Sequence, residues 1–132
     1  MQKKAEKAGR ILAAEEQLHR IEQWKMSDLE RRLADLEAMQ IELISALNET
    51  NALHGLFIDT TARRLGSIAE EAERVGREKA VQALKLKEHA TRVKICERLA
   101  LERAQDFERE KEGKELQDVV EQFVGRKGTS LP

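Results

Sequence analysis

The side chains of this chain that could carry out chemistry are three histidines and one cysteine. His19, His54 and His89 lie far apart, and none belongs to an HExxH or a Cys/His pattern of metal ligands. Cys96 has no base at a fixed spacing beside it, so we interpret it as a packed thiol and not as a nucleophile. We therefore expect no metal site and no catalytic cysteine.

Paired carboxylates and phosphate-binding loops are the next candidates for a site. The adjacent glutamates at 15–16 and 70–71 point to different sides of a helix, without a cleft that could raise a pKa for acid–base catalysis. The sequence contains neither GxGxxG nor GxxxxGK[ST]. These patterns predict a protein that is not an enzyme and that binds no cofactor.

The composition is typical of long helices. Charged residues make up 37% of the 132 residues and aromatic residues 3%, and the single proline is Pro132. Seven glycines are too few to provide the turns of a β or α/β fold. So few large apolar side chains predict a narrow seam between helices, and hence an all-α fold.

Charge and hydropathy argue against nucleic acid and membrane partners. The net charge is −1, and 24 basic residues alternate with 25 acidic ones without forming a basic patch. No apolar run approaches the roughly 18 residues of a membrane span, and MQKKAEKAGR lacks the apolar segment of a signal peptide. A single cysteine fits a reducing compartment, so we expect a cytoplasmic protein without membrane insertion.

Apolar side chains recur every three or four residues in two series, as in coiled coils. Upstream of the first series, a similar spacing is found at Ile11, Ala14, Leu18 and Ile21. Joining these residues to the first series takes a step of eleven residues, from Leu18 to Leu29, which predicts a local slip of the frame. Trp24 lies off the seam and is a candidate anchor for a partner. The first series is Met26, Leu29, Leu33, Leu36, Gln40, Leu43, Leu47 and Thr50, and the second is Ile58, Thr61, Leu65, Ile68, Ala72, Val75, Lys79, Gln82, Leu86, His89, Val93, Cys96, Ala100, Arg103 and Phe107.

A helical hairpin with a turn near residues 48–58 explains these two series. Asn and Thr are poor helix formers, and Gly55 is favoured just after a helix end. The pattern predicts one domain over residues 1–124, with helices over about 4–53 and 57–124, and a frayed tail over 125–132. Two alternatives stay open: a turn at Gly66, where Ser67 could cap the next helix, and one unbroken helix that pairs with a copy of itself.

A pivot at Gly55 pairs residues whose numbers add up to about 111, such as Leu36 with Val75. The second helix is then the longer one, and the apolar stripe at its end has no partner in its own chain. The cluster that follows Gly55 would have few neighbours at the tip of the hairpin and is a second candidate binding surface. The candidate partner-binding residues are Leu56, Phe57, Ile58, Leu116, Val120 and Phe123.

The chain resembles the small flagellar and virulence type III secretion stalk proteins of the FliJ/YscO type. The resemblance rests on the two-helix pattern, on LFIDTTARRL at the start of the second helix and on FEREKEGKELQDVVEQF near its end. It implies a rod that links the hexameric ring of the export ATPase to the export gate protein and engages export chaperones. In that family, Phe57 would match the gate-contacting patch, and the stripe of Leu116, Val120 and Phe123 would match the end that enters the ring.

Two other functions remain open at this point. A secretion chaperone could wrap an exported subunit, and a structural coiled coil could form a homodimer or a larger homo-oligomer. We expect the adaptor and chaperone functions to differ in their need for residues 110–132.

Overall fold

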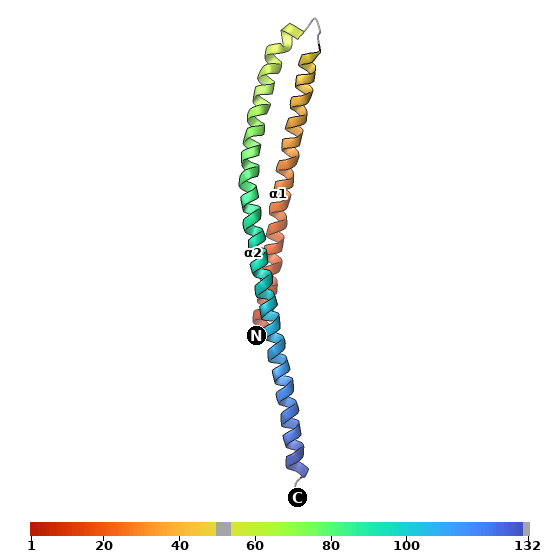
Figure 1. The fold of residues 1–132 in the computed structure, drawn as a ribbon, viewed down its shortest axis with the longest axis vertical. Helices are drawn as coiled ribbons and strands as arrows, with labels where there is room; N and C mark the ends of the chain where they lie inside the picture. Colours follow the sequence, from red (N-terminus) through yellow and green to blue (C-terminus); the bar gives the residue numbers. More distant parts are fainter. Residues whose placement is uncertain (50–53, 131–132) are drawn as a thin grey trace. The chain divides into compact units, whose positions relative to one another are not determined.

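The structure is a computed structural model that describes residues 1–49 and 54–130, leaving out the side chains of His54, Leu56 and residues 126–130. Helix α1 covers Gln2–Asn48 and helix α2 covers His54–Ser130, and the described residues contain no strand. The two helices contact each other as an all-α hairpin (Figure 1), which confirms the predicted fold class.

The connection between the helices lies between Asn48 and His54, inside the predicted range. Gly66 and Ser67 belong to the interior of α2, so the alternative turn at Gly66 is wrong. Gly55 does not close α1 either: it lies in the first turn of α2, and no described residue has a positive φ. The turn comes earlier than Gly55 because the poor helix formers at 48–51 already end α1.

The helix ends differ from those expected from the sequence. Helix α1 ends at Asn48 instead of near residue 53, and α2 begins at His54 instead of near 57. The tail expected to fray from residue 125 is helical as far as Ser130, and residues 131–132 lie outside the described residues. Glycine costs a helix about 1 kcal/mol without blocking it, and continuing α2 satisfies backbone carbonyls that an end at residue 124 would expose.

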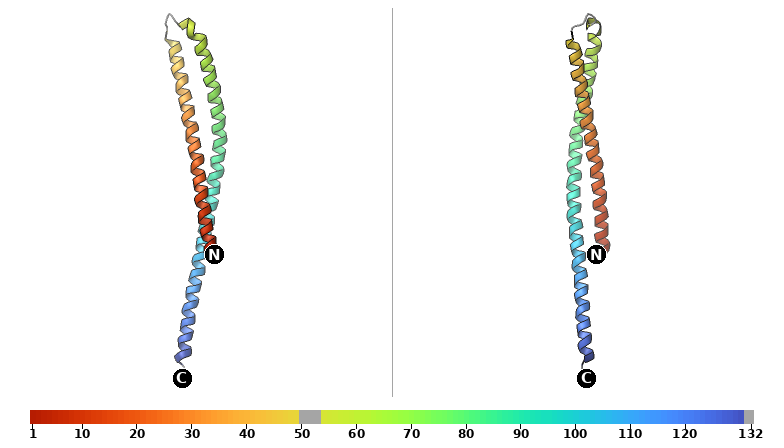
Figure 2. Two further views of the ribbon diagram at one scale, coloured as in Figure 1. Left: turned by 180° about the vertical axis from the view of Figure 1, so that it is seen from behind. Right: turned by 90° about the vertical axis from the view of Figure 1, so that its right-hand side faces the viewer.

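The chain divides into two compact units: residues 18–90 form one, called the turn-side unit here, and residues 1–17 with 91–132 form the other, called the end unit. Two further views show α1 beside α2 in the turn-side unit (Figure 2). Its core is one row of seam side chains from both helices, all at positions that the sequence predicts. The buried members are Leu29, Leu36, Ile68 and Val75, with Leu33, Leu43 and Ala72 packed against them.

The predicted seam of α2 agrees with burial along most of its length. Every seam position from Thr61 to Phe107 is buried or half-buried, and Val75 is the most buried of them, with 3% of its surface exposed. Only the first position, Ile58, is 41% exposed. A single seven-residue frame therefore passes through α2 without a slip, as two packed helices require.

The frame predicted for the start of α1 is wrong. Ile11, Leu18 and Ile21 are 41%, 45% and 51% exposed, and Ala14 is exposed as well. The positions turned inward continue the frame of Met26 backwards without the predicted slip. An unbroken frame keeps the helices in one register. It also places Glu15 and His19 in the seam, each with one polar atom that is shielded from solvent and has no hydrogen-bond partner. The inward positions are Ala5, Ala8, Leu12, Glu15, His19 and Glu22.

Candidate protein-interaction site

His19, His89 and Cys96 lie at inward positions of the two helices. No three His, Cys, Asp or Glu side chains among these residues are grouped as metal ligands. His19 and His89 are half-buried, each with its Nδ1 atom shielded from solvent and without a hydrogen-bond partner, and Cys96 is half-buried. The side chain of His54 lies outside the described residues.

A polar layer crosses the seam of the turn-side unit at Gln82, the one buried polar residue of the described core. The Nε2 group of Gln82 donates a hydrogen bond of 3.0 Å to the backbone carbonyl of Glu22 and one of 2.5 Å to its Oε2 atom. The Nζ group of Lys25 lies 3.2 Å from the other carboxylate oxygen. Gln82 first, and Lys25 second, lower the pKa of the Glu22 carboxyl below its usual value.

This layer sets the register of the two helices. A pivot at Gly55 predicts position 89 opposite Glu22, whereas the observed hydrogen bond joins Glu22 to Gln82. The charge of His89 is a further, smaller cause of the lowered pKa of Glu22. At the polar layer of the turn-side unit the partner of Glu22 is therefore seven residues nearer the start of α2 than predicted, because the turn precedes Gly55. In the end unit, Met1 and Glu110 still add up to the predicted 111.

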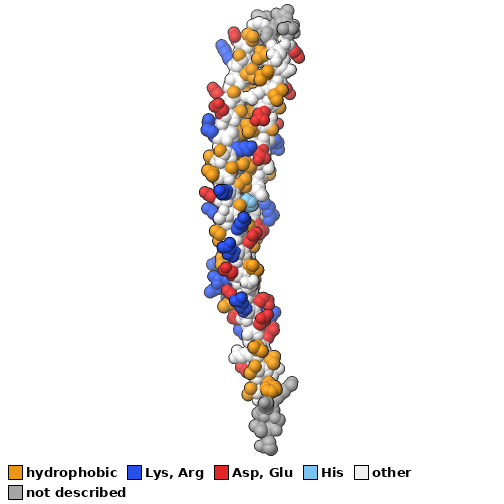
Figure 3. Space-filling view, viewed as in Figure 1, with side chains coloured by type: hydrophobic (Ala, Val, Ile, Leu, Met, Phe, Trp, Pro, Cys, Tyr) orange, Lys and Arg blue, Asp and Glu red, His pale blue; other side chains and the backbone are white. Residues whose placement is uncertain are grey.

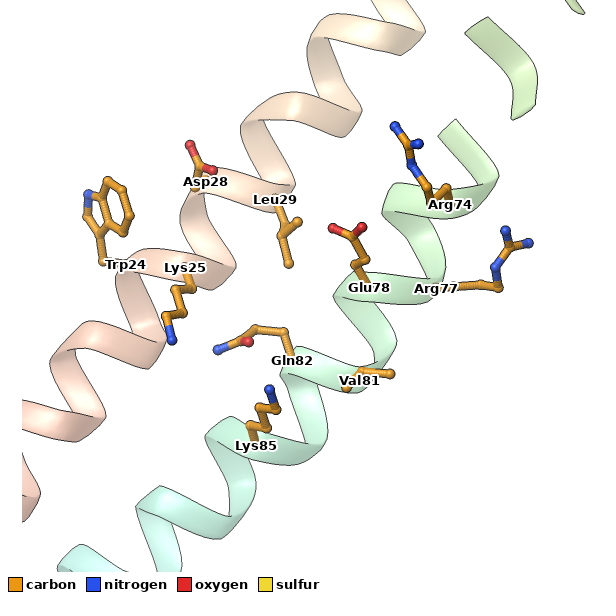
Figure 4. Close-up of a pocket in the computed structure, with 10 residues that line it drawn as sticks. All are labelled: Trp24, Lys25, Asp28, Leu29, Arg74, Arg77, Glu78, Val81, Gln82 and Lys85. Carbon is orange, nitrogen blue, oxygen red and sulfur yellow. The ribbon is translucent and has the colours of Figure 1, made fainter. Parts of the chain in front are cut away.

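A cleft of about 470 Å³ lies beside the polar layer on the surface of the turn-side unit. Leu29 of α1 and Gln82 of α2 both extend into the space between the helices, whereas Trp24 and Arg77 project away from it on the two sides (Figure 4). Trp24 is 67% exposed and Val81 is 55% exposed. The cleft thus offers apolar surface to a partner, in a place that the sequence indicated only through Trp24.

The rim of the cleft carries four basic side chains and two acidic ones: Lys25, Arg74, Arg77 and Lys85 against Asp28 and Glu78. Lys25 pairs with Glu22, and Arg74 pairs with Glu71 at 3.6 Å. Asp28 is held by Arg31 at 2.6 Å and by Arg32 at 3.3 Å. Arg77, Lys85 and Glu78 make no ion pair with any described residue, so the unpaired side chains of the rim are two cations and one anion.

In the end unit, α1 begins beside α2 near Glu110. The amino group of Met1 lies 3.8 Å from Oε2 of Glu110, and the backbone N–H of Ala5 donates a bond of 3.0 Å to the Met1 carbonyl. Every residue from 111 to 125 is exposed. Residues 111–125, called the α2 end segment here, thus continue beyond the part of α2 that α1 covers.

The α2 end segment brings together three of the predicted partner-binding residues. Leu116, Val120 and Phe123 follow one another at the helical spacing of four and three residues, and they are 67%, 52% and 57% exposed. Val119 and Val124 widen this stripe, with exposed fractions of 60% and 61%. Figure 3 shows hydrophobic side chains gathered at this end of α2.

The other three predicted residues belong to the turn-side unit, at the beginning of α2. Phe57 is 59% exposed and Ile58 is 41% exposed. The side chain of Leu56 lies outside the described residues. The structure therefore leaves Phe57 accessible to a partner and groups it with Ile58 on the first turns of one helix.

Comparison of the chain with protein-family models, with curated proteins and with solved structures finds no match. Among the described residues, no helix is both long enough and apolar enough to span a membrane. Function is therefore inferred from the two exposed apolar surfaces, the cleft and the resemblance in the sequence.

Proposed function

We propose that this chain is a non-enzymatic coiled-coil adaptor of a flagellar or type III protein export apparatus, acting in the cytoplasm. The exposed α2 end segment is the observation that carries the proposal. In this role its apolar stripe contacts the hexameric export ATPase, and Phe57 contacts the export gate protein. Export chaperones are further partners by the same resemblance.

The physical support is the amount of apolar surface on a helix that α1 does not cover. Leu116, Val119 and Val120 are each more than half exposed within two helical turns. Contiguous apolar surface of this kind marks interaction sites, whereas isolated exposed side chains do not. A helix of this type docks its apolar face into a groove of a partner.

Binding of the purified full chain to a hexameric export ATPase tests the proposal, with stimulated ATP hydrolysis as a second readout. We expect Leu116→Glu with Val120→Glu to weaken binding at least tenfold, because two apolar anchors become charged. Leu101→Glu is a matched control, since Leu101 is 60% exposed in the same unit but lies outside the stripe. Equal helicity of the three chains by circular dichroism excludes unfolding as the cause.

Absence of binding to the ATPase ring, with a nucleotide analogue that keeps the ring assembled, would refute the adaptor function. A secretion chaperone would instead bind an exported subunit whether or not residues 110–132 are present. A structural homo-oligomer would associate with itself and bind neither the ATPase nor an exported subunit.

A further inference from the structure

The cleft and the α2 end segment have opposite charge and matching apolar surface. The rim of the cleft carries two more basic than acidic side chains. The α2 end segment carries two more acidic than basic residues, with glutamates 112, 115 and 121 and Asp118 against Lys111 and Lys114. One surface is a groove with Trp24 and Val81 at its sides, and the other is an apolar helix face.

We propose that the α2 end segment of a second copy of this chain docks into the cleft. The acidic amphipathic helix that fits the cleft is present in every copy of the chain, as part of the same helix α2 that lines the cleft. A second copy therefore supplies the apolar side chains and the carboxylates together.

Unpaired charges on both surfaces strengthen this match. Arg77 and Lys85 of the cleft have no ion pair among the described residues, and neither has Glu78. On the α2 end segment the same holds for four carboxylates and one cation: Glu112, Glu115, Asp118, Glu121 and Lys111. Lys114, in contrast, is already engaged with Glu110 at 3.7 Å. Docking brings two available cations of one copy near two available anions of the other, where their attraction also steers the encounter.

The docked contact is small, so the dimer is weak and sensitive to salt. Only the apolar face of a short helical segment enters the cleft, which places the interface at the low end of specific protein contacts. Exposed charge pairs weaken as the ionic strength rises. A docked α2 end segment is also unavailable to another protein, so self-association competes with any partner that uses the same stripe.

Sedimentation of the purified full chain over a wide concentration series tests this docking without any export component. We expect a concentration-dependent dimer that weakens as salt is added. Arg77→Glu with Lys85→Glu should raise the dimer dissociation constant about tenfold, and Glu112→Lys with Glu115→Lys should do the same. One chain that carries all four substitutions should regain the original affinity within about threefold, because the charges again oppose each other.

The matched control is Arg63→Glu with Arg64→Glu, two exposed arginines of α2 outside the cleft. This control should leave the dissociation constant unchanged. A chain that stays monomeric at every concentration would overturn the proposal. So would a chain with all four charge substitutions that fails to regain the original dimer affinity. A chain that binds the ATPase ring without dimerising, or that dimerises without binding the ring, would show that one proposal fails while the other stands.

Discussion

Replacing Gly66 by alanine tests whether the connection between the helices lies between Asn48 and His54 or at Gly66. Gly66 lies in the interior of α2, no described residue has a positive φ, and no heavy atom comes within 4 Å of a Cβ placed on Gly66. Alanine thus fits without strain and removes the helix penalty of glycine, about 1 kcal/mol. We expect the free energy of unfolding to rise by about that amount and the melting temperature by about 4 °C.

Urea and thermal unfolding followed by far-UV circular dichroism measure this change, at one protein concentration because association shifts the apparent stability. Ala83→Gly, at another exposed interior position of α2, is the reverse control and should lower the stability by a similar amount. A loss of stability in Gly66→Ala would refute the reasoning. It would mean that residue 66 needs the left-handed conformation of a helix end.

Two further predictions concern the seam of the turn-side unit. Val75→Ala should lower the free energy of unfolding by about 2 kcal/mol, because Val75 is 3% exposed. Val81→Ala, at a position that is 55% exposed, should change it by less than about 0.5 kcal/mol. Equal effects of the two substitutions in urea unfolding would contradict the assigned core. The lowered pKa of Glu22 adds stability above the unfolded value of about 4.5 that is lost as the pH falls through the lower folded value. Glu22→Gln should therefore flatten the acid side of the stability profile, and an unchanged profile would contradict the role of the Gln82 hydrogen bond.

The fold class and the seam of α2 could be predicted because both depend on local spacing. A seven-residue apolar repeat determines which face of a helix packs, whatever the partner is. The repeat from Thr61 to Phe107 includes polar members such as Lys79 and Arg103, yet its apolar members are frequent enough to determine the frame. The exposed stripe on the α2 end segment could be predicted for the same reason.

The inward face at the start of α1 could not be predicted from hydropathy. Ile11, Leu18 and Ile21 have the helical spacing of a seam, so they seemed better candidates than Glu22 and its neighbours in the frame. What favours Glu22 is a partner sixty residues away, the amide of Gln82, which satisfies its carboxylate and its backbone carbonyl. No local pattern contains that information.

The cleft depends on register in the same way, since its sides come from both helices. A shift of one heptad that placed Gln82 opposite Leu29 would leave its amide and the Glu22 carboxylate without each other, which costs more than the loss of an apolar contact. A single polar layer can therefore fix the register of an otherwise permissive apolar seam. Because it fixes the register, the same layer also determines that Trp24 and Val81 lie beside one cleft. The hydrogen bond between Gln82 and Glu22 thus determines the shape of the cleft that is offered to a partner.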